Sequence, residues 1–349
     1  MMMISDSARS LREYFTTRPG PLALLLVIVF AVAPDAAVAQ VTPDRTYYGH
    51  GREIPVSVAV PAGSEDADGE VNIVLFDAAG NRVARAAVLP GAVDLASFFP
   101  ILWGQNEPKV LYAQMYVGEE GDEDARPAGS PLVLQPLLTP MRAVVNADRS
   151  IRWQEAPQLF SGMRLYVDKL LQFNTTEGEM LFRLRPDHAP NTVWHIRHLV
   201  EGGFYTDIAF HRVVPTHPSG KPFVIQAGDP AGNGMGGPGV AIDLEPSELN
   251  HDFGVLSMAR GPNPDSNGSQ FFVALSREAT VHLNGAYTAF GEAIEGAQAI
   301  LAIEQTPLED SRSGKPVDAP RIISAQMIDA PPFGTGPSPV QRPESSGER

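Results

Sequence analysis

The segments Phe210-His-Arg-Val-Val-Pro215, Phe223-Val-Ile-Gln-Ala-Gly-Asp229 and Gly268-Ser-Gln-Phe-Phe272 decide the fold of this 349-residue chain. In each of them one long polar side chain, an Arg or a Gln, is set among apolar residues. Short apolar runs bounded by Gly and Pro are typical of buried strands. We therefore expect Arg212 on one strand and Phe223 to Gln226 on the next.

Five shorter motifs flank these segments in order: Thr175-Thr-Glu-Gly-Glu179, Pro186-Asp-His-Ala-Pro-Asn-Thr192, Gly202-Gly-Phe-Tyr205, Leu256-Ser-Met-Ala-Arg260 and Tyr287-Thr-Ala-Phe-Gly291. So many matches in a fixed order exclude chance agreement. From about Leu170 to Ile328 the chain resembles the cyclophilin family of peptidyl-prolyl cis/trans isomerases. The resemblance implies an eight-stranded antiparallel β-barrel closed at its ends by two helices.

Two stretches of this region have helical spacing. Ala189 to Gly202 begins with a proline in its first turn, repeats apolar residues such as Val193 and Ile196 at helical intervals, and ends at two glycines. A shorter helix is expected near Glu295 to Ile303. The remainder of the region is expected to form strands, so the fold class is dominated by β-structure.

The chemistry of X-Pro isomerisation explains why such residues are needed. Rotation about a peptide bond works against amide resonance, a barrier of roughly 18–20 kcal/mol. An enzyme needs an apolar slot for the proline ring and a fixed donor aimed at the prolyl nitrogen, which gains a lone pair as the bond twists. It needs no nucleophile, metal or cofactor, and we expect none.

The resemblance assigns roles to residues of this chain. Arg212 is expected to supply the guanidinium, while two glutamines orient it and bind the substrate backbone. Apolar side chains line the proline slot, and backbone groups near Ala259 meet the residue before proline. The predicted catalytic residues are Arg212, Gln226 and Phe272. The predicted substrate-binding residues are Phe223, Val224, Ala259, Arg260, Gln270, His282, Leu283 and Tyr287.

Two features depart from the family pattern. His282 stands where the eukaryotic members carry a Trp that rims the pocket. Thr216–Pro222 separates Pro215 from Phe223, where the common pattern has a single Gly. We expect this segment to form an exposed loop beside the site, because closure of a longer loop costs little free energy.

The expected partners are proline-containing polypeptides, and two functions remain open for the domain that binds them. The first is catalysis of X-Pro isomerisation during the folding of secreted proteins. The alternative is a non-catalytic cyclophilin-like binding module or chaperone that grips proline-containing segments. Retention of Arg212, Gln226 and Gln270 favours the enzyme. The oligomeric state is left open.

The first 39 residues are typical of a secretory signal peptide. Three arginines precede an apolar run from Leu22 to Ala33, and Ala37-Val38-Ala39 has the small-x-small form of a cleavage site. The run is too short to span a bilayer. We therefore expect cleavage after Ala39, no stable membrane insertion afterwards, and a periplasmic or secreted protein.

Between the signal and the barrel, residues 40–162 show strand patterns without a catalytic constellation. Val71 to Phe76 and Val83 to Val88 flank a Gly-containing turn, and an acidic run, Glu119–Asp124, interrupts the pattern. A β-sandwich-like module is expected there, followed by the isomerase domain over 163–330. The Pro-, Gly- and Ser-rich tail, 331–349, is expected to be disordered.

Composition and the remaining motifs exclude other functions. The net charge of −15 argues against nucleic-acid binding, and the absence of Cys excludes disulfides and thiolate metal sites. Gly232–Gly237 matches G-x-G-x-x-G, but no helix follows to face a pyrophosphate. His195 and His198 lie one helical turn apart without an evident third ligand, so we expect no metal site.

Overall fold

The computed structural model describes residues 39–60, 69, 71–118, 125–154 and 159–343. The predicted signal peptide up to residue 38, the acidic run 119–124 and the last six residues of the predicted tail lie outside these ranges. In the described part of the chain, no helix combines the length and the apolar character needed to cross a bilayer.

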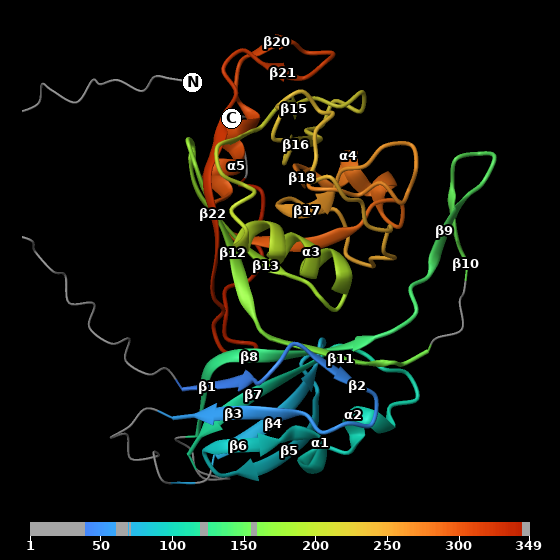
Figure 1. Cartoon of the computed structure of the whole chain (residues 1–349). Helices are drawn as coiled ribbons and strands as arrows, with labels where there is room; N and C mark the ends of the chain where they lie inside the picture. Colours follow the sequence, from blue (N-terminus) through green and yellow to red (C-terminus); the bar gives the residue numbers. More distant parts are fainter. Residues whose placement is uncertain (1–38, 61–68, 70, 119–124, 155–158, 344–349) are drawn as a thin grey trace, which may run out of the picture. The chain divides into compact units, whose positions relative to one another are not determined.

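Residues 40–167 form two antiparallel sheets that share one core (Figure 1). The smaller sheet has the strand order β1 (Gln40–Pro43), β3 (Pro55–Ala59), β6 (Gly91–Asp94). The larger has the order β2 (Tyr47–Gly49), β11 (Gly162–Val167), β8 (Arg126–Leu137), β7 (Leu111–Val117), β4 (Val71–Asp77), β5 (Arg82–Val88). Two short helices follow β6, α1 (Leu95–Phe98) and α2 (Ile101–Gly104). A separate hairpin pairs β9 (Arg142–Val145) with β10 (Ile151–Gln154).

The alternation of apolar residues explains this arrangement. Val56 and Val58 of β3 are buried, while Ser57 between them is exposed, so one face of the strand packs inward. Ile73 and Leu75 of β4 are fully buried in the same core. The predicted β-sandwich-like region is therefore confirmed.

The boundary between the sandwich and the barrel lies later than the sequence predicted. Strand β11 pairs with β2 and β8 of the sandwich, and its Met163 and Leu165 are buried in the sandwich core. A domain boundary after residue 162 would separate Met163 and Leu165 from the sandwich core in which they are buried. The strands of the sandwich therefore extend to Val167, the last residue of β11.

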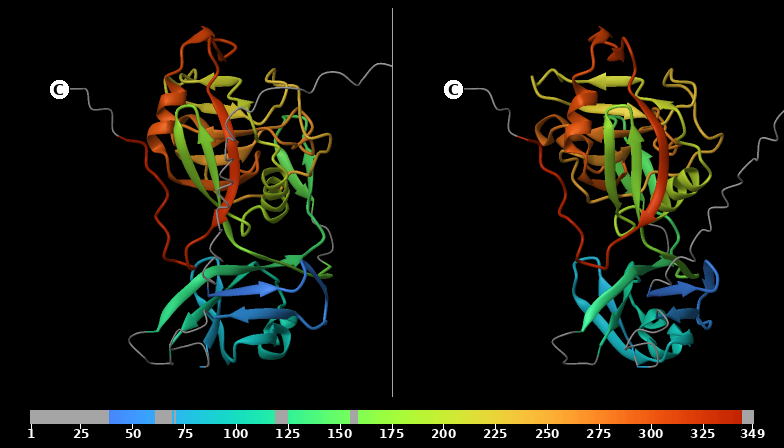
Figure 2. Two further views of the ribbon diagram at one scale, coloured as in Figure 1. Left: turned by 60° about the vertical axis from the view of Figure 1, so that its left-hand side comes forward. Right: turned by 90° about the vertical axis from the view of Figure 1, so that its left-hand side faces the viewer.

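Residues 169–329 form an antiparallel nine-stranded sheet that curls around its own core (Figure 2). Its strand order is β14 (Ile208–Ala209), β22 (Arg321–Asp329), β12 (Lys169–Thr175), β13 (Gly178–Leu184), β19 (Ala289–Glu295), β17 (Val255–Met258), β18 (Phe271–Ala274), β16 (Val224–Ala227), β15 (Arg212–Val214). The two edge strands, β14 and β15, are separated in the chain only by Phe210 and His211. The chain therefore connects the two edges directly and the sheet curls as in a barrel, but no described ladder joins β14 to β15, and the sheet has nine strands where the resemblance implied eight.

Helices close the ends of this barrel. The expected helices appear as α3 (Pro190–Glu201) and α5 (Ala297–Glu304), and α4 (Arg277–Thr280) runs into a 3₁₀ turn, η1 (Val281–Leu283). A short hairpin of β20 (Leu308–Asp310) and β21 (Lys315–Pro316) precedes β22. The predicted fold class, dominated by β-structure with a cyclophilin-like barrel, is confirmed.

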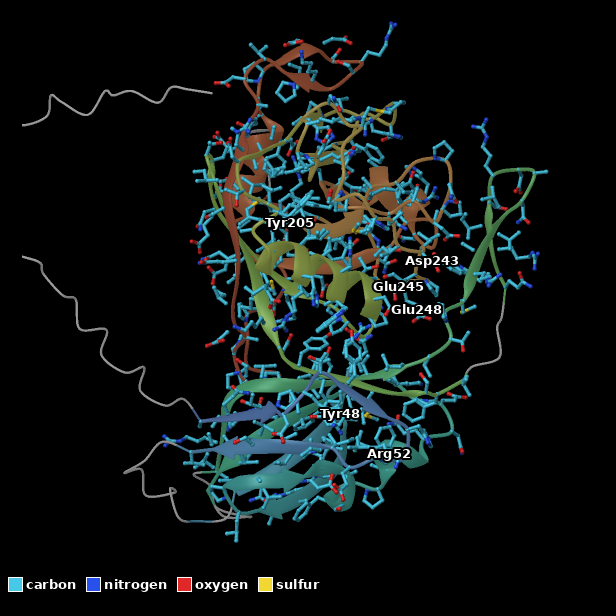
Figure 3. All side chains as sticks on the ribbon, in the orientation of Figure 1. Tyr48, Arg52, Tyr205, Asp243, Glu245 and Glu248 are labelled. Carbon is cyan, nitrogen blue, oxygen red and sulfur yellow. The ribbon has the colours of Figure 1, made fainter. Side chains whose placement is uncertain are left out.

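Helix α3 begins without a side-chain cap of its own, because its N-cap residue is Ala189. Glu245, labelled in Figure 3, supplies the missing acceptors. Its carboxylate accepts from the backbone N–H groups of Asn191 and Thr192, at 3.0 and 2.6 Å, and from the Thr192 hydroxyl at 2.6 Å. A distant acidic residue thus satisfies the orphan donors of the first turn.

The described part of the C-terminal tail, residues 331–343, differs from the expected disorder. Phe333 stacks on Phe76 with ring centroids 5.1 Å apart, and its N–H donates to Gln114 Oε1 at 2.7 Å. Val340 N–H donates to Ala293 O at 2.8 Å, and Arg342 pairs with Glu304 at 2.9 Å. These anchors are single residues within a Pro- and Gly-rich stretch, so composition did not reveal them.

Candidate active site

Strands β15, β16 and β18 bring the predicted catalytic residues to one face of the barrel sheet. Arg212 lies directly opposite Gln226, and Gln226 lies directly opposite Phe272. Directly opposed residues of antiparallel strands project from the same face. The guanidinium, the amide and the phenyl ring therefore share one surface.

A chain of hydrogen bonds fixes the orientation of Arg212. Its Nη1 donates to Gln226 Oε1 at 3.3 Å, and Gln226 Nε2 donates to Gln270 Oε1 at 3.0 Å. Gln270 Nε2 then donates to the carbonyl oxygens of Gly234 and Gly236, at 3.0 and 2.9 Å. Each glutamine uses its oxygen as acceptor and its nitrogen as donor, so both amide orientations are determined.

The glycine-rich segment whose carbonyl oxygens accept from Gln270 surrounds the buried carboxylate of Asp229. Asp229 accepts backbone N–H groups from Ala231, Asn233 and Gly234, at 2.7, 2.9 and 2.6 Å. Burial would raise the pKa of Asp229, but these backbone hydrogen bonds outweigh it and lower the pKa. A Cβ at Gly236 would lie 2.0 Å from Asp229 Oδ1. The backbone of this segment therefore surrounds the chain's own carboxylate, and Gly236 is required by its close approach to Asp229.

Next to Arg212 lies an apolar cluster built from the predicted slot residues. Val224, Phe272 and Leu283 are buried in it, and Phe223, Ala259 and Tyr287 pack around them half-exposed, together with Val214. The Phe272 and Tyr287 rings meet edge to face, with centroids 5.8 Å apart. The cluster supplies apolar side chains next to the sheet face that carries the Arg212 guanidinium, and rotation about a prolyl bond requires both.

This part of the chain is similar to known proteins. Residues 170–327 match the family described as cyclophilin type peptidyl-prolyl cis-trans isomerase/CLD. Peptidyl-prolyl cis-trans isomerase-like 1 of Aspergillus fumigatus is 34% identical over 164 residues, which cover 45% of this chain and 94% of the relative. Peptidyl-prolyl cis-trans isomerase ppi1 of Schizosaccharomyces pombe is 34% identical over 163 residues, covering 45% of this chain and 98% of the relative. The chain belongs to the cyclophilin family.

Two further relatives complete the comparison of the cyclophilin domain. A peptidyl-prolyl cis-trans isomerase of Arabidopsis thaliana is 38% identical over 163 residues, but the match covers only 26% of that protein and 45% of this chain. A crystal structure of a Cryptosporidium parvum cyclophilin type isomerase, in the presence of the dipeptide Ala-Pro, is 33% identical with a TM-score of 0.40. It covers 45% of this chain and 96% of that protein. The cyclophilin domain of this chain is a peptidyl-prolyl cis/trans isomerase.

His251 is a buried residue that contacts the candidate site and that the sequence analysis did not predict. The His251 ring stacks on Phe272 with centroids 5.7 Å apart, and its nitrogens contact Asn284 Oδ1 at 2.8 Å and Ser257 Oγ at 2.9 Å. Burial lowers the pKa of His251. No local pattern could have found this role, because the three contacts come from separate parts of the chain.

Arg260 is engaged within the protein. Its Nη2 donates to Ala286 O at 2.9 Å, and its guanidinium lies 4.6 Å from the centroid of the Tyr287 ring. The N–H of Ala259 donates to Gln270 O at 2.9 Å. The Arg260 side chain thus contacts the segment that carries Tyr287, and its predicted contribution to substrate binding stays a prediction.

The two histidines of α3 contact backbone carbonyls. His195 Nε2 contacts Gly268 O at 2.9 Å, and His198 Nδ1 contacts Trp194 O at 2.8 Å. A carbonyl oxygen can only accept, so both nitrogens are donors. Among the described residues there is no group of three or more His, Asp or Glu side chains that could hold a metal. His195 instead ties α3 to the start of the Gly268–Phe272 segment.

Hydrogen bonds from two further residues also fix the Gly268–Phe272 segment. Tyr205, labelled in Figure 3, is fully buried and its hydroxyl donates to Ser269 O at 2.8 Å. The Ser269 hydroxyl donates in turn to Gly228 O at 2.6 Å. These bonds fix the backbone from which Gln270 and Phe272 project, so the site rests on a rigid core.

Proposed function

We propose that this isomerase acts on X-Pro bonds of polypeptides that are exported and then fold in a periplasm or outside the cell. The observation that carries the catalytic part is Arg212, held by Gln226 and Gln270 beside the apolar cluster that contains Phe272. The export part rests on the signal-like residues 1–39. Relatives that are named peptidyl-prolyl cis-trans isomerases support X-Pro bonds as the substrates.

The proposed mechanism uses binding and electrostatics alone. The proline ring enters the recess formed by Phe223, Val224, Phe272 and Leu283. The Arg212 guanidinium then donates to the prolyl nitrogen as amide resonance is lost, an interaction available only to the twisted state. Because Gln226 already orients Arg212, little reorganisation accompanies this step.

Isomer exchange in a short Xaa-Pro peptide tests catalysis. Catalytic amounts of the protein without residues 1–39 should speed exchange between cis and trans signals in the NMR spectrum. Saturable binding of the peptide without faster exchange would instead establish the binding-module alternative. Fractionation of cells that express the full chain tests export, because cleavage after Ala39 gives a smaller protein outside the cytoplasm.

A further inference from the structure

The loop that joins β15 to β16 (yellow in Figure 1) is a tight turn of defined geometry. His217 N–H donates to Lys221 O at 2.7 Å, and Gly220 N–H donates to His217 O at 2.7 Å. Pro218 occupies the second position of the turn, and Gly220 has φ +78°, which glycine adopts without strain. The turn therefore holds His217 at its base in one place.

The His217 side chain packs against two residues of the predicted site. Its ring centroid lies 5.0 Å from that of Phe223 and 5.8 Å from that of His282. The rings of Phe223 and His282 are themselves stacked, 5.8 Å apart and 12° from parallel. Three rings from three segments thus form one aromatic wall, which we define as His217, Phe223 and His282.

Hydrogen bonds fix the orientation and the tautomer of the His217 ring. Ser219 N–H donates to His217 Nδ1 at 3.3 Å, and Ser219 Oγ lies 3.0 Å from the same nitrogen. An N–H group can only donate, so Nδ1 is the acceptor and the proton of the neutral ring lies on Nε2. His217 is half-buried and His282 is exposed, so the wall presents aromatic surface to solvent.

The aromatic wall lies at one end of strand β18, and the backbone expected to hold the residue before proline lies at the other. Ala259 N–H bonds to Gln270 O, before the strand, while Leu275 N–H bonds to Phe223 O, after it. Five residues of extended chain separate these points, roughly 16 Å. A substrate that places its pre-proline residue over Ala259 and its proline beside Phe272 therefore directs the following residue towards the wall.

We propose that His217 is a specificity-determining residue, which makes the enzyme prefer an aromatic side chain directly after proline. The inference rests on the proposed isomerase function of the same site. Aromatic rings gain from edge-to-face or offset contact with one another beyond the area they bury, equivalent to a preference of about three- to tenfold. Removal of one ring of the wall removes part of that surface and frees the other two to move.

The test compares the peptides Ala-Ala-Pro-Phe and Ala-Ala-Pro-Ala, with both ends blocked, by NMR exchange with the protein lacking residues 1–39. The wild type should favour the Phe peptide in kcat/KM by about three- to tenfold. His217→Ala should bring the ratio close to one, mainly through KM. His217→Phe should keep the preference, because the ring is retained without its nitrogens. Lys221→Ala, an exposed change in the same turn, is the matched control and should leave the ratio unaltered.

The outcomes separate the two hypotheses. A wild type that accelerates both peptides equally, or a His217→Ala variant that keeps the full preference with an unchanged NMR fingerprint, overturns the inference alone. A wild type that accelerates neither peptide overturns the proposed function as well. If Lys221→Ala also abolishes the preference, the turn as a whole rather than the His217 ring is responsible, and the inference is wrong.

Discussion

Arg212 is held in place before any substrate arrives, because Gln226 accepts from it and Gln270 orients Gln226. A donor that is already oriented stabilises the twisted state more than it stabilises either planar isomer. The position of the guanidinium thus depends on Gln226 of β16 and on Gln270, which directly precedes β18.

Replacement of Arg212 tests this assignment. We expect Arg212→Ala to lower kcat/KM by about 10²–10³, the usual loss for one transition-state donor. Arg212→Lys should be nearly as impaired, because an ammonium lacks the planar donor fork. Peptide exchange rates and circular dichroism of the purified variants are the measurements. An Arg212→Ala protein with more than half the wild-type rate and an unchanged spectrum contradicts the mechanism.

His251 makes the stability of the domain depend on pH. Burial lowers its pKa below the usual value of 6.5, so the unfolded chain binds a proton more readily than the folded one. This contribution to stability is complete above pH 6.5 and is lost as the pH falls, by at most about 1.4 kcal/mol per pH unit.

Denaturant unfolding between pH 7.5 and 5 measures the loss. As the pH falls, the wild type should lose more free energy of unfolding than His251→Gln does. The comparison is needed because burial raises the pKa of Asp168 to about 7, and this group opposes the histidines equally in both proteins. Three other histidines with lowered pKa, His188, His195 and His211, keep part of the slope in the variant. Identical slopes in the two proteins would show that His251 is protonated equally in both states.

At the scale of elements, the hairpin β20–β21 buttresses the strand that carries Arg212. Val213 N–H donates to Gly314 O at 2.7 Å, and a Cβ at Gly314 would lie 2.6 Å from Val213 O and 3.4 Å from Arg212 Cγ. Gly314 also has φ +74°, which side chains rarely adopt. The close approach of the two backbones therefore requires glycine.

We expect Gly314→Val to displace β15 and to reduce kcat more than KM, by about tenfold or more, since a misplaced donor weakens the twisted state most. Gly334→Val, at a positive-φ glycine with no atom near its Cβ position and outside the barrel sheet, is the control for backbone strain. Equal losses in the two variants would mean that strain, not the contact with β15, is responsible.

The turn 216–222 should be dispensable for the reaction itself. Arg212 and Phe223 to Gln226 are paired through β15 and β16 whether the connection is long or short. Replacement of Thr216–Pro222 by one glycine should leave the exchange rate on Ala-Ala-Pro-Ala within about tenfold, since loop closure entropy changes slowly with length. A well-folded deletion variant with no activity on this peptide would place the turn in the catalytic apparatus.

At the scale of the whole molecule, the described residues from 39 to 343 belong to one compact unit, and specific contacts join the sandwich and the barrel. Trp194 of α3 lies 5.2 Å from the Tyr166 ring and 4.7 Å from the Arg164 guanidinium, both on β11. Arg197 Nη1 donates to Val167 O at 2.7 Å. Phe333 adds a second set of contacts to the sandwich.

Despite these contacts, we expect the two parts to fold independently. Each part has its own core. A fragment of residues 168–343 should be soluble and retain most of the kcat/KM on a tetrapeptide, with a lower Tm because Trp194 and Phe333 lose their partners. Fragment expression, thermal unfolding and peptide exchange test this. An insoluble or inactive fragment, when the full chain is active, would show that the parts depend on each other.

The sequence alone determined the barrel and predicted which residues lie together at the candidate site. Arg212, Gln226, Gln270 and Phe272 lie in short motifs whose positions within strands are local, so strand pairing in the expected order was enough to bring them together. The helix at Pro190–Glu201 was likewise determined locally, by apolar spacing and by the proline and glycines at its ends.

Other features were decided only by the tertiary structure, because they depend on partners that are distant in the chain. Strand β11 could pair with either half by its pattern, and burial of Met163 and Leu165 assigned it to the sandwich. Phe333 and Arg342 are single anchors that no periodicity reveals. The aromatic wall required a turn to place His217 on Phe223 and His282, since a ring contact is specified by three-dimensional proximity rather than by spacing along the chain.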